Sequence, residues 1–241
     1  MRIALLGYGK MGKAIEEIAI AKGHQIVLKV SRETNYDLST IDVAIDFSIP
    51  EMAVTHLTNC LEAGVPVVSG TTGWLKDYDK ITTLCDTKKG AFLYASNFSV
   101  GVNIFFELNK RLAELMAPLS EYNVSLEEIH HTQKLDAPSG TAITLAEGII
   151  SNTTNEKWEL MEKESDNAFA KAEEKTIPIS SKRTGQVPGT HIIDYKSPID
   201  TITIKHEAHS RAGFAQGALL AAEWLVGKKG VFSMRDVLNI S

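Results

Sequence analysis

Short apolar runs and amphipathic stretches alternate through the first hundred residues, and this order predicts repeated strand–helix units. The apolar runs predict strands at residues 2–6, 25–30, 42–47, 67–69 and 91–95. Apolar positions at helical spacing predict helices after residue 12 and near residues 51–63 and 76–88. Strands that alternate with helices form parallel sheets, so this part of the chain is expected to be a doubly wound α/β domain.

The pattern changes in the second half of the chain. It predicts a helix at 102–116, a strand at 123–129 and a helix at 141–150, and the polar segment 151–175 reads as a surface excursion. Polar and apolar residues then alternate at 176–180, 191–195 and 201–207, which predicts antiparallel strands of a mixed α+β domain. An Ala- and Leu-rich helix at 213–226 is expected to return to the first domain. We therefore predict one domain from residues 1–97 and 211–241 and a second from 98–210.

Composition narrows the classes of function. Of the 241 residues 44% are hydrophobic, as in ordinary globular proteins, and a net charge of −5 argues against a nucleic-acid-binding surface. Cys60 and Cys85 lack the spacing of a zinc site or a disulfide framework, which fits a reducing compartment. No secretion signal or membrane-spanning stretch is visible in the sequence, so a cytoplasmic protein is expected.

A glycine-rich turn directly follows the first predicted strand. Its G-x-G-x-x-G pattern is typical of dinucleotide binding, because the glycines allow a tight turn, close approach of a pyrophosphate and close packing of the next helix. The helix N-terminus stabilises the phosphates. The expected cofactor-binding residues of this turn are Gly7, Tyr8, Gly9, Lys10, Met11 and Gly12. A turn that merely connects two elements is the alternative interpretation.

The end of the second predicted strand bears on the choice of nucleotide. An acidic residue at this place normally binds the adenosine ribose of NAD, but the sequence here is Ser31-Arg32-Glu33. Arg32 can pair with a 2′-phosphate, so NADPH is expected to be accepted at least as well as NADH. Glu33 leaves the preference open, as does the interpretation of Arg32 as a solvated loop charge.

The stretch 127–141, E-E-I-H-H-T-Q-K-L-D-A-P-S-G-T, holds the densest set of proton-carrying and anion-binding groups in the chain. His130 and His131 follow the predicted strand, and the ammonium of Lys134 lies just beyond. The segment from Asp136 to Thr141 reads as a turn into a helix, whose first N–H groups lack intrahelical partners and attract an anion. This set suits a carboxylate substrate that must be protonated.

The histidines also have structural interpretations, since a single histidine is more often structural or solvated than catalytic. Adjacent strand residues point to opposite faces, so at most one of His130 and His131 is expected to do chemistry directly, while the other binds or orients. The same divergence disfavours a metal, and His206 and His209 lack a third ligand, so no metal site is expected. Three further polar residues lie where the second domain can face an acidic ligand, but charged loop residues are mostly solvated: Lys182, Arg183 and His191.

The pattern E-x-H-H-x-x-K-x-D-A-P-S-G-T resembles the signature of the bacterial dihydrodipicolinate reductases, now called 4-hydroxy-tetrahydrodipicolinate reductases, of the diaminopimelate route to lysine. The glycine-rich turn, the G-T-T-G loop at 70–73, the segment 95–101 and the closing F-S-M-R-D-V-L match the same family, so the resemblance covers nearly the whole chain. It implies a Rossmann-type domain with a mixed substrate and oligomerisation domain, and a homotetramer.

The resemblance also implies an activity, the reduction of a cyclic imine dicarboxylate by NADPH or NADH after loss of water. His130 is the expected general acid/base and Lys134 the expected proton donor. Substrate carboxylates are expected on His131, Ser139, Gly140 and Thr141. The nicotinamide side is expected on Gly70, Thr71, Thr72, Ala95, Ser96, Asn97 and Phe98. Cofactor and substrate then lie on different domains, so closure about hinges near 98–101 and 210–213 is expected.

Two other functions remain open. The first alternative is another two-domain dehydrogenase that acts on an amino dicarboxylate, because the nucleotide domain is shared by many activities. The H-H-x-x-K and P-S-G-T cluster speaks against this alternative. A dinucleotide-sensing binding protein without catalysis is the second alternative, and such a sensor does not need His130 and Lys134 beside an anion site.

Overall fold

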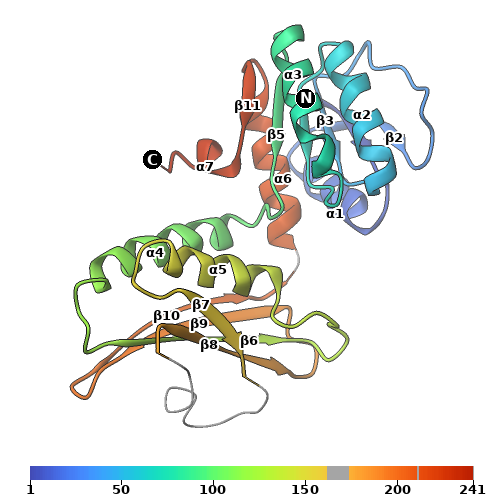
Figure 1. Ribbon diagram of the computed structural model, residues 1–241. Helices are drawn as coiled ribbons and strands as arrows, with labels where there is room; N and C mark the ends of the chain where they lie inside the picture. The colour runs from blue at the N-terminus through green and yellow to red at the C-terminus, as the bar shows by residue number, and fades with distance from the viewer. Residues whose placement is uncertain (162–173, 211, 241) are drawn as a thin grey trace. The chain divides into compact units, whose positions relative to one another are not determined.

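The computed structural model describes residues 1–161, 174–210 and 212–240. The chain forms two compact units, Met1–Asn103 with Ala212–Ser241, and Ile104–Arg211 (Figure 1). The sequence analysis placed the boundaries at 97/98 and 210/211. None of the helices in the described residues is long and apolar enough to cross a membrane.

The first unit is built on a parallel six-stranded sheet of order β11-β5-β4-β3-β1-β2. The strands are β1 (Arg2–Leu6), β2 (Gln25–Val30), β3 (Val43–Asp46), β4 (Val67–Ser69), β5 (Ala91–Tyr94) and β11 (Gly230–Phe232). Five of them were predicted, and the doubly wound α/β class is confirmed. The edge strand β11 was not predicted, because its three residues are only partly buried and begin with glycine, so they lack the apolar run of the buried strands.

Helices cover both faces of this sheet. They are α1 (Lys10–Ala21), α2 (Pro50–Glu62), α3 (Tyr78–Lys88) after the short 3-10 helix η1 (Leu75–Asp77), α6 (Ala212–Leu225) and α7 (Met234–Val237). Along β1, Ile3 and Leu5 pack in one apolar core with α1 and α6, whereas Ala4 and Leu6 pack in another with α2 and α3. The expectation that the C-terminal helix returns to the first domain is confirmed.

The second unit contains a five-stranded mixed sheet of order β10-β9-β6-β8-β7. Its strands are β6 (Asn123–His130), β7 (Lys157–Leu160), β8 (Thr176–Arg183), β9 (Gly189–Lys196) and β10 (Thr201–Ala208). The helices α4 (Val100–Met116), which starts in the first unit, and α5 (Gly140–Ile150) lie over one face of the sheet (Figure 1). Val124, Leu126, Glu128 and His130 of β6 are buried, in alternation with less buried residues.

Two predictions for this unit were wrong. The polar segment 151–175 contains β7, in which Trp158 and Leu160 alternate with exposed Lys157 and Glu159 as on a half-buried edge strand; residues 162–173 lie outside the described part. The strand β8 runs parallel to both β6 and β7 rather than antiparallel. The helix α5 connects β6 to β7. A strand that follows such a helical crossover runs in the same direction as the strand before the helix, so β7 is parallel to β6.

Candidate active site

Every cofactor segment predicted from the sequence follows the carboxyl end of a strand in the first unit. The glycine-rich turn follows β1, Arg32 follows β2, residues 70–72 follow β4 and residues 95–98 follow β5. These strands are parallel neighbours in the sheet, with β2 on one side of β1 and β3 on the other. Such a change of direction in strand order is where open α/β sheets bind dinucleotides. The sheet therefore collects the four segments along one edge.

Two of the three glycines in the first turn, Gly7 and Gly12, leave no room for a side chain. A Cβ on Gly7, whose φ is +93°, would lie 2.2 Å from the carbonyl oxygen of Phe47, and one on Gly12 would lie 2.6 Å from the carbonyl oxygen of Gly7. Gly9 is different, because nothing lies within 4 Å of its Cβ position. Lys10 and Met11 form the first turn of α1. The turn thus has the tight bend, the open backbone and the helix N-terminus that a pyrophosphate requires.

Hydrogen bonds and ion pairs to two carboxylates, Glu16 and Glu33, order the side chains and the loop next to this turn. The hydroxyl of Tyr8 contacts Glu16, and the ammonium of Lys29 lies 2.5 Å from Glu16 and 4.7 Å from the centre of the Tyr8 ring. After β2, the carboxylate of Glu33 accepts hydrogen bonds from the N–H groups of Ser31 and Arg32 at 2.7 and 2.9 Å. The backbone N–H groups of Glu33 itself, of Ser31 and of Arg32 hold the pKa of Glu33 below its ordinary value. Glu33 therefore shapes this loop, and the side chain of Arg32 is exposed.

The G-T-T-G loop is fixed by a buried carboxylate that the sequence analysis did not single out. Asp46, at the end of β3, is fully buried, and its Oδ2 accepts hydrogen bonds from the hydroxyls of Ser69 and Thr71, each at 2.8 Å. Burial raises the pKa of Asp46. The Thr71 hydroxyl also accepts from the N–H of Ser48 at 2.9 Å. Thr71 therefore anchors the loop, and exposed Thr72 and the backbone of Gly70 are the parts it presents.

The segment after β5 is anchored in a similar way. Phe98 is 1% exposed and its ring packs 5.6 Å from that of Phe47, so its side chain belongs to the core. The Asn97 side-chain oxygen accepts from the N–H of Ser99 at 2.9 Å, which tightens the turn into α4. Ala95 and Ser96 continue the line of β5, with the N–H of Ala95 bonded to the carbonyl of Ser69 at 3.2 Å. This segment therefore offers mainly backbone to a ligand.

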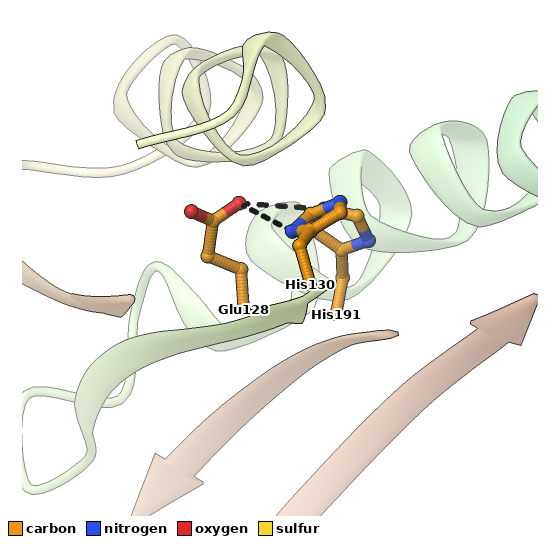
Figure 2. A group of neighbouring side chains, drawn as sticks. All are labelled: Glu128, His130 and His191. Carbon is orange, nitrogen blue, oxygen red and sulfur yellow. Dashed lines mark ion pairs between the residues drawn. The ribbon is translucent and has the colours of Figure 1, made fainter. Parts of the chain in front are cut away.

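In the second unit, the carboxyl end of β6 carries a cluster of three buried side chains. Glu128 and His130 project from β6 and His191 projects from the adjacent strand β9 (Figure 2). The Oε2 atom of Glu128 lies 3.3 Å from Nδ1 of His130 and 3.9 Å from Nε2 of His191. The two imidazole rings meet edge to face with centroids 5.2 Å apart. His130 is thus buried at the strand end, and His131 is the more exposed of the pair.

The charges of this cluster are set by burial and by hydrogen bonds. Burial of Glu128 opposes its ionisation, but bonds from His130, the Ser139 N–H, the Ser181 hydroxyl and Arg183 outweigh this effect and hold its pKa well below its ordinary value. Burial, with the nearby His130 ring, lowers the pKa of His191 to about 4. The cluster therefore combines a fixed anion with a neutral imidazole at neutral pH.

The loop that carries Lys134 is tied to the same cluster by Arg183. The Nη2 atom of Arg183 donates to Oε1 of Glu128 at 3.0 Å and to the carbonyl of Asp136 at 2.7 Å. The ammonium of Lys134 lies 2.7 Å from both carboxylate oxygens of Asp136. The interpretation of Arg183 and His191 as solvated charges was wrong, because both lie on paired strands and bond inward. Lys182 does lie on the strand as well, paired with Glu127 at 2.8 Å.

The turn into α5 places Ser139 as the N-cap. Its hydroxyl accepts from the N–H of Ala142 at 3.2 Å and lies 3.2 Å from Nε2 of His191, and its own N–H donates to Glu128 at 3.1 Å. Both polar groups of Ser139 are thus used within the protein. The N–H groups of Gly140 and Thr141 open the helix and have no acceptor inside it, so they are available to donate to an anion.

Sequence profiles of known families match both units. A profile described as dihydrodipicolinate reductase, N-terminus, matches residues 1–98, and one described as dihydrodipicolinate reductase, C-terminus, matches residues 101–238. The chain belongs to the dihydrodipicolinate reductase family. The resemblance carried by the sequence motifs is therefore confirmed.

Individual relatives agree with this assignment. A 4-hydroxy-tetrahydrodipicolinate reductase of Christiangramia forsetii is 54% identical over 99% of this chain and 98% of its own. One of Lawsonia intracellularis is 32% identical over 95% of this chain and 96% of its own. The dipicolinate-bound dihydrodipicolinate reductase of a Paenisporosarcina species shares the fold, with a TM-score of 0.77 at 24% identity over 100% of this chain and 99% of its own.

Motif reading missed several residues that build these sites. Asp46 and Glu128 are carboxylates on strands, and the side chains of both are fully buried. The spacing of Glu128, two positions before a candidate catalytic histidine, is the signal that would have found it, because side chains at i and i+2 share one face of a strand. Arg183 and His191 carried no such signal, since their proximity depends on the pairing of β6 with β8 and β9.

Proposed function

We propose that the protein reduces 4-hydroxy-tetrahydrodipicolinate to tetrahydrodipicolinate, with loss of water, using NADPH or NADH. Family membership over nearly the whole chain supports this activity. The observation that carries the assignment of residues is the ring of bonds around Glu128. Its Oε2 atom lies 3.3 Å from Nδ1 of His130, and Arg183 links its carboxylate to the loop of Lys134. Both candidate proton carriers are thus fixed next to the open N-terminus of α5.

The first unit is proposed to bind the cofactor along the carboxyl edge of its sheet. Bound nicotinamide supplies the hydride. The pyrophosphate is assigned to the turn of residues 7–12, and the adenosine ribose or its 2′-phosphate to the loop with Arg32. The nicotinamide side is assigned to Gly70, Thr71 and Thr72 and to Ala95, Ser96, Asn97 and Phe98, with Thr71 and Phe98 acting mainly through backbone.

The second unit is proposed to bind the diacid and to handle protons. His131 and the N–H groups of Gly140 and Thr141 hold carboxylates, because each offers a donor to an anion. Ser139 supports this contact by capping the helix. Loss of water leaves a C=C bond conjugated to the imine, and hydride addition to that bond leaves negative charge that a proton must neutralise. Lys134 donates that proton while His130 acts as general acid/base. Closure of the two units about the expected hinges near 98–101 and 210–213 brings hydride and imine together.

Coupled turnover tests this proposal. The unstable substrate is generated from pyruvate and aspartate semialdehyde by the upstream synthase, and oxidation of NADPH or NADH is followed by absorbance. His130→Gln and Lys134→Ala are expected to lower kcat by about 10²- to 10⁴-fold, the usual effect of losing a placed proton-transfer group. Lys88→Ala, at an exposed position of α3, serves as the control and should retain wild-type turnover. Wild-type rates in both site variants would remove the assignment.

We also propose a homotetramer located in the cytoplasm, as the family resemblance implies. The helices α4 and α5 cover one face of the second sheet, and no other described helix of this unit covers the opposite face. That face is therefore free to pair with another copy. Light scattering should give four times the 26.4 kDa of the chain, and a monomer mass would contradict the assembly.

A further inference from the structure

Glu128 has an unusual position for a carboxylate with no assigned chemistry. Its side chain is 0% exposed, yet it lies directly beside the candidate general acid/base. Ionised carboxylates are costly to bury unless hydrogen bonds satisfy them. Here the bonds from the Ser139 N–H, the Ser181 hydroxyl and Arg183, at 3.1, 2.8 and 3.0 Å, offset that cost. The protein therefore keeps an anion fixed at one nitrogen of His130.

We propose that Glu128 is a positioning residue that sets the tautomer of His130. An anionic oxygen 3.3 Å from Nδ1 favours a ring with its proton on Nδ1, because a carboxylate only accepts hydrogen bonds. The lone pair is then on Nε2, the nitrogen free to exchange a proton with substrate. The inference rests on the proposed function, since it assigns the working nitrogen of the same histidine.

The environment of Nε2 agrees with this assignment. Gly189, at the start of β9, lies against that edge of the ring, and a Cβ there would be 3.0 Å from Nε2. The glycine thus leaves space at the nitrogen that Glu128 does not hold. His191 flanks the ring from the side and stays neutral at neutral pH, so it adds no competing positive charge.

A metal ion is the alternative use of this trio. Glu128, His130 and His191 each place a ligand atom within 4.8 Å of the others. The guanidinium of Arg183, 3.0 Å from Oε1, repels a cation, and the Ser139 N–H occupies Oε2. The carboxylate is thus already saturated by donors, one of them charged. These contacts favour the positioning role over a metal site.

Glu128→Gln tests the proposal because it keeps the shape of the side chain and removes the charge. The amide oxygen should stay with Arg183 and Ser181, which both donate to Oε1. The amide NH₂ then takes the place of Oε2 and donates to Nδ1 of His130, so the ring proton moves to Nε2, and the N–H of Ser139 loses its acceptor. A general base with the wrong tautomer cannot accept a proton at its working nitrogen. We expect kcat to fall about 100-fold or more, with the KM for reduced nicotinamide unchanged.

Glu127→Gln is the matched control. Glu127 is the preceding residue of β6, points to the other face of the strand and pairs with Lys182 at 2.8 Å. It loses the same charge without touching His130, so kcat and the tautomer should stay as in the wild type. Wild-type turnover of Glu128→Gln would overturn the proposal.

The tautomer itself is read by ¹⁵N NMR of histidine-labelled protein, with the His130 signals assigned from the spectrum of His130→Gln. The wild type should show a protonated Nδ1 and an unprotonated Nε2 in the neutral ring, and Glu128→Gln the reverse. A wild-type ring protonated on Nε2 overturns the proposal even if no Glu128 variant folds. This measurement needs no turnover, so it tests the tautomer independently of the reaction. A failure of the proposed catalytic role of His130 is seen separately, as wild-type activity of His130→Gln. Loss of activity on dialysis against a chelator, restored by zinc, would also overturn the positioning role.

Discussion

The hydroxyl of Thr71 donates a 2.8 Å hydrogen bond to the carboxylate of Asp46, and both side chains are buried at the carboxyl edge of the first sheet. This bond joins the loop after β4 to the end of β3. The backbone of the loop is reinforced by a 2.9 Å bond from the N–H of Gly70 to the carbonyl of Asp46. The shape of the candidate nicotinamide loop therefore depends on Asp46, a residue that is not itself assigned to bind the cofactor.

Thr71→Val should loosen this loop. Valine has nearly the same shape but leaves the N–H of Ser48 without its acceptor and Asp46 with one donor fewer, a loss of about 1–3 kcal/mol of unfolding free energy. We expect the KM for NADPH and NADH to rise several-fold while the KM for the diacid is unchanged. Denaturant titration and initial-rate assays measure the two effects. The same substitution at exposed Thr83 on α3 should alter neither.

Alanine at Gly7 should lower stability, whereas alanine at Gly9 should weaken cofactor binding. At Gly7 the new Cβ meets the backbone of Phe47 at 2.2 Å with φ at +93°, so Gly7→Ala should reduce thermal stability strongly. At Gly9 nothing lies within 4 Å, so Gly9→Ala should leave the melting temperature near that of the wild type. A ligand that approaches the backbone there would meet the methyl group, so the KM for the cofactor should rise at least about 10-fold. Unchanged cofactor binding by Gly9→Ala would contradict the assigned turn.

Arg32→Ala should change the nucleotide preference. A guanidinium that pairs with a 2′-phosphate adds a charge-assisted hydrogen bond worth about 1.5–3 kcal/mol, so its loss should weaken NADPH by about 10- to 100-fold relative to NADH. Comparison of kcat/KM for the two nucleotides measures this ratio. Arg111→Ala, at an exposed position of α4, should leave the ratio as it is. An unaltered ratio in Arg32→Ala would show that Arg32 is a solvated loop charge.

His191 should make the protein less stable in mild acid. Its pKa is about 4 in the folded chain against an ordinary value of 6.5, so between these values the unfolded chain binds a proton that the folded chain does not. Stability therefore falls as the pH falls through this range. From pH 7 to pH 5 the wild type should lose about 2 kcal/mol more than His191→Gln. Urea titrations at the two pH values measure this, and His209→Gln, at an exposed position, should behave as the wild type.

Many of the strands and helices could be predicted from the sequence because they depend on local patterns of apolar and polar residues. The strands β1 and β3 are buried on both faces of the sheet, so their sequences are apolar runs. The helices α1 and α2 each pack on one face of the sheet, so their apolar residues recur at helical spacing. The glycine-rich turn and the run from Glu127 to Thr141 were equally local, since their residues are close in sequence. Short or half-buried edge strands such as β7 and β11 were missed because their patterns are weak.

The sequence by itself determined the doubly wound domain, the candidate cofactor turn and the stretch that carries His130 and Lys134. Only the tertiary structure decided which side chains support them, because strand pairing joins residues that are far apart along the chain. Arg183 and His191 reach Glu128 through β8 and β9, across sequence separations of 55 and 63 residues that no motif spans. Electrostatics followed the same division: an ionised carboxylate is stable in that interior only because donors from other strands and from the start of α5 surround it.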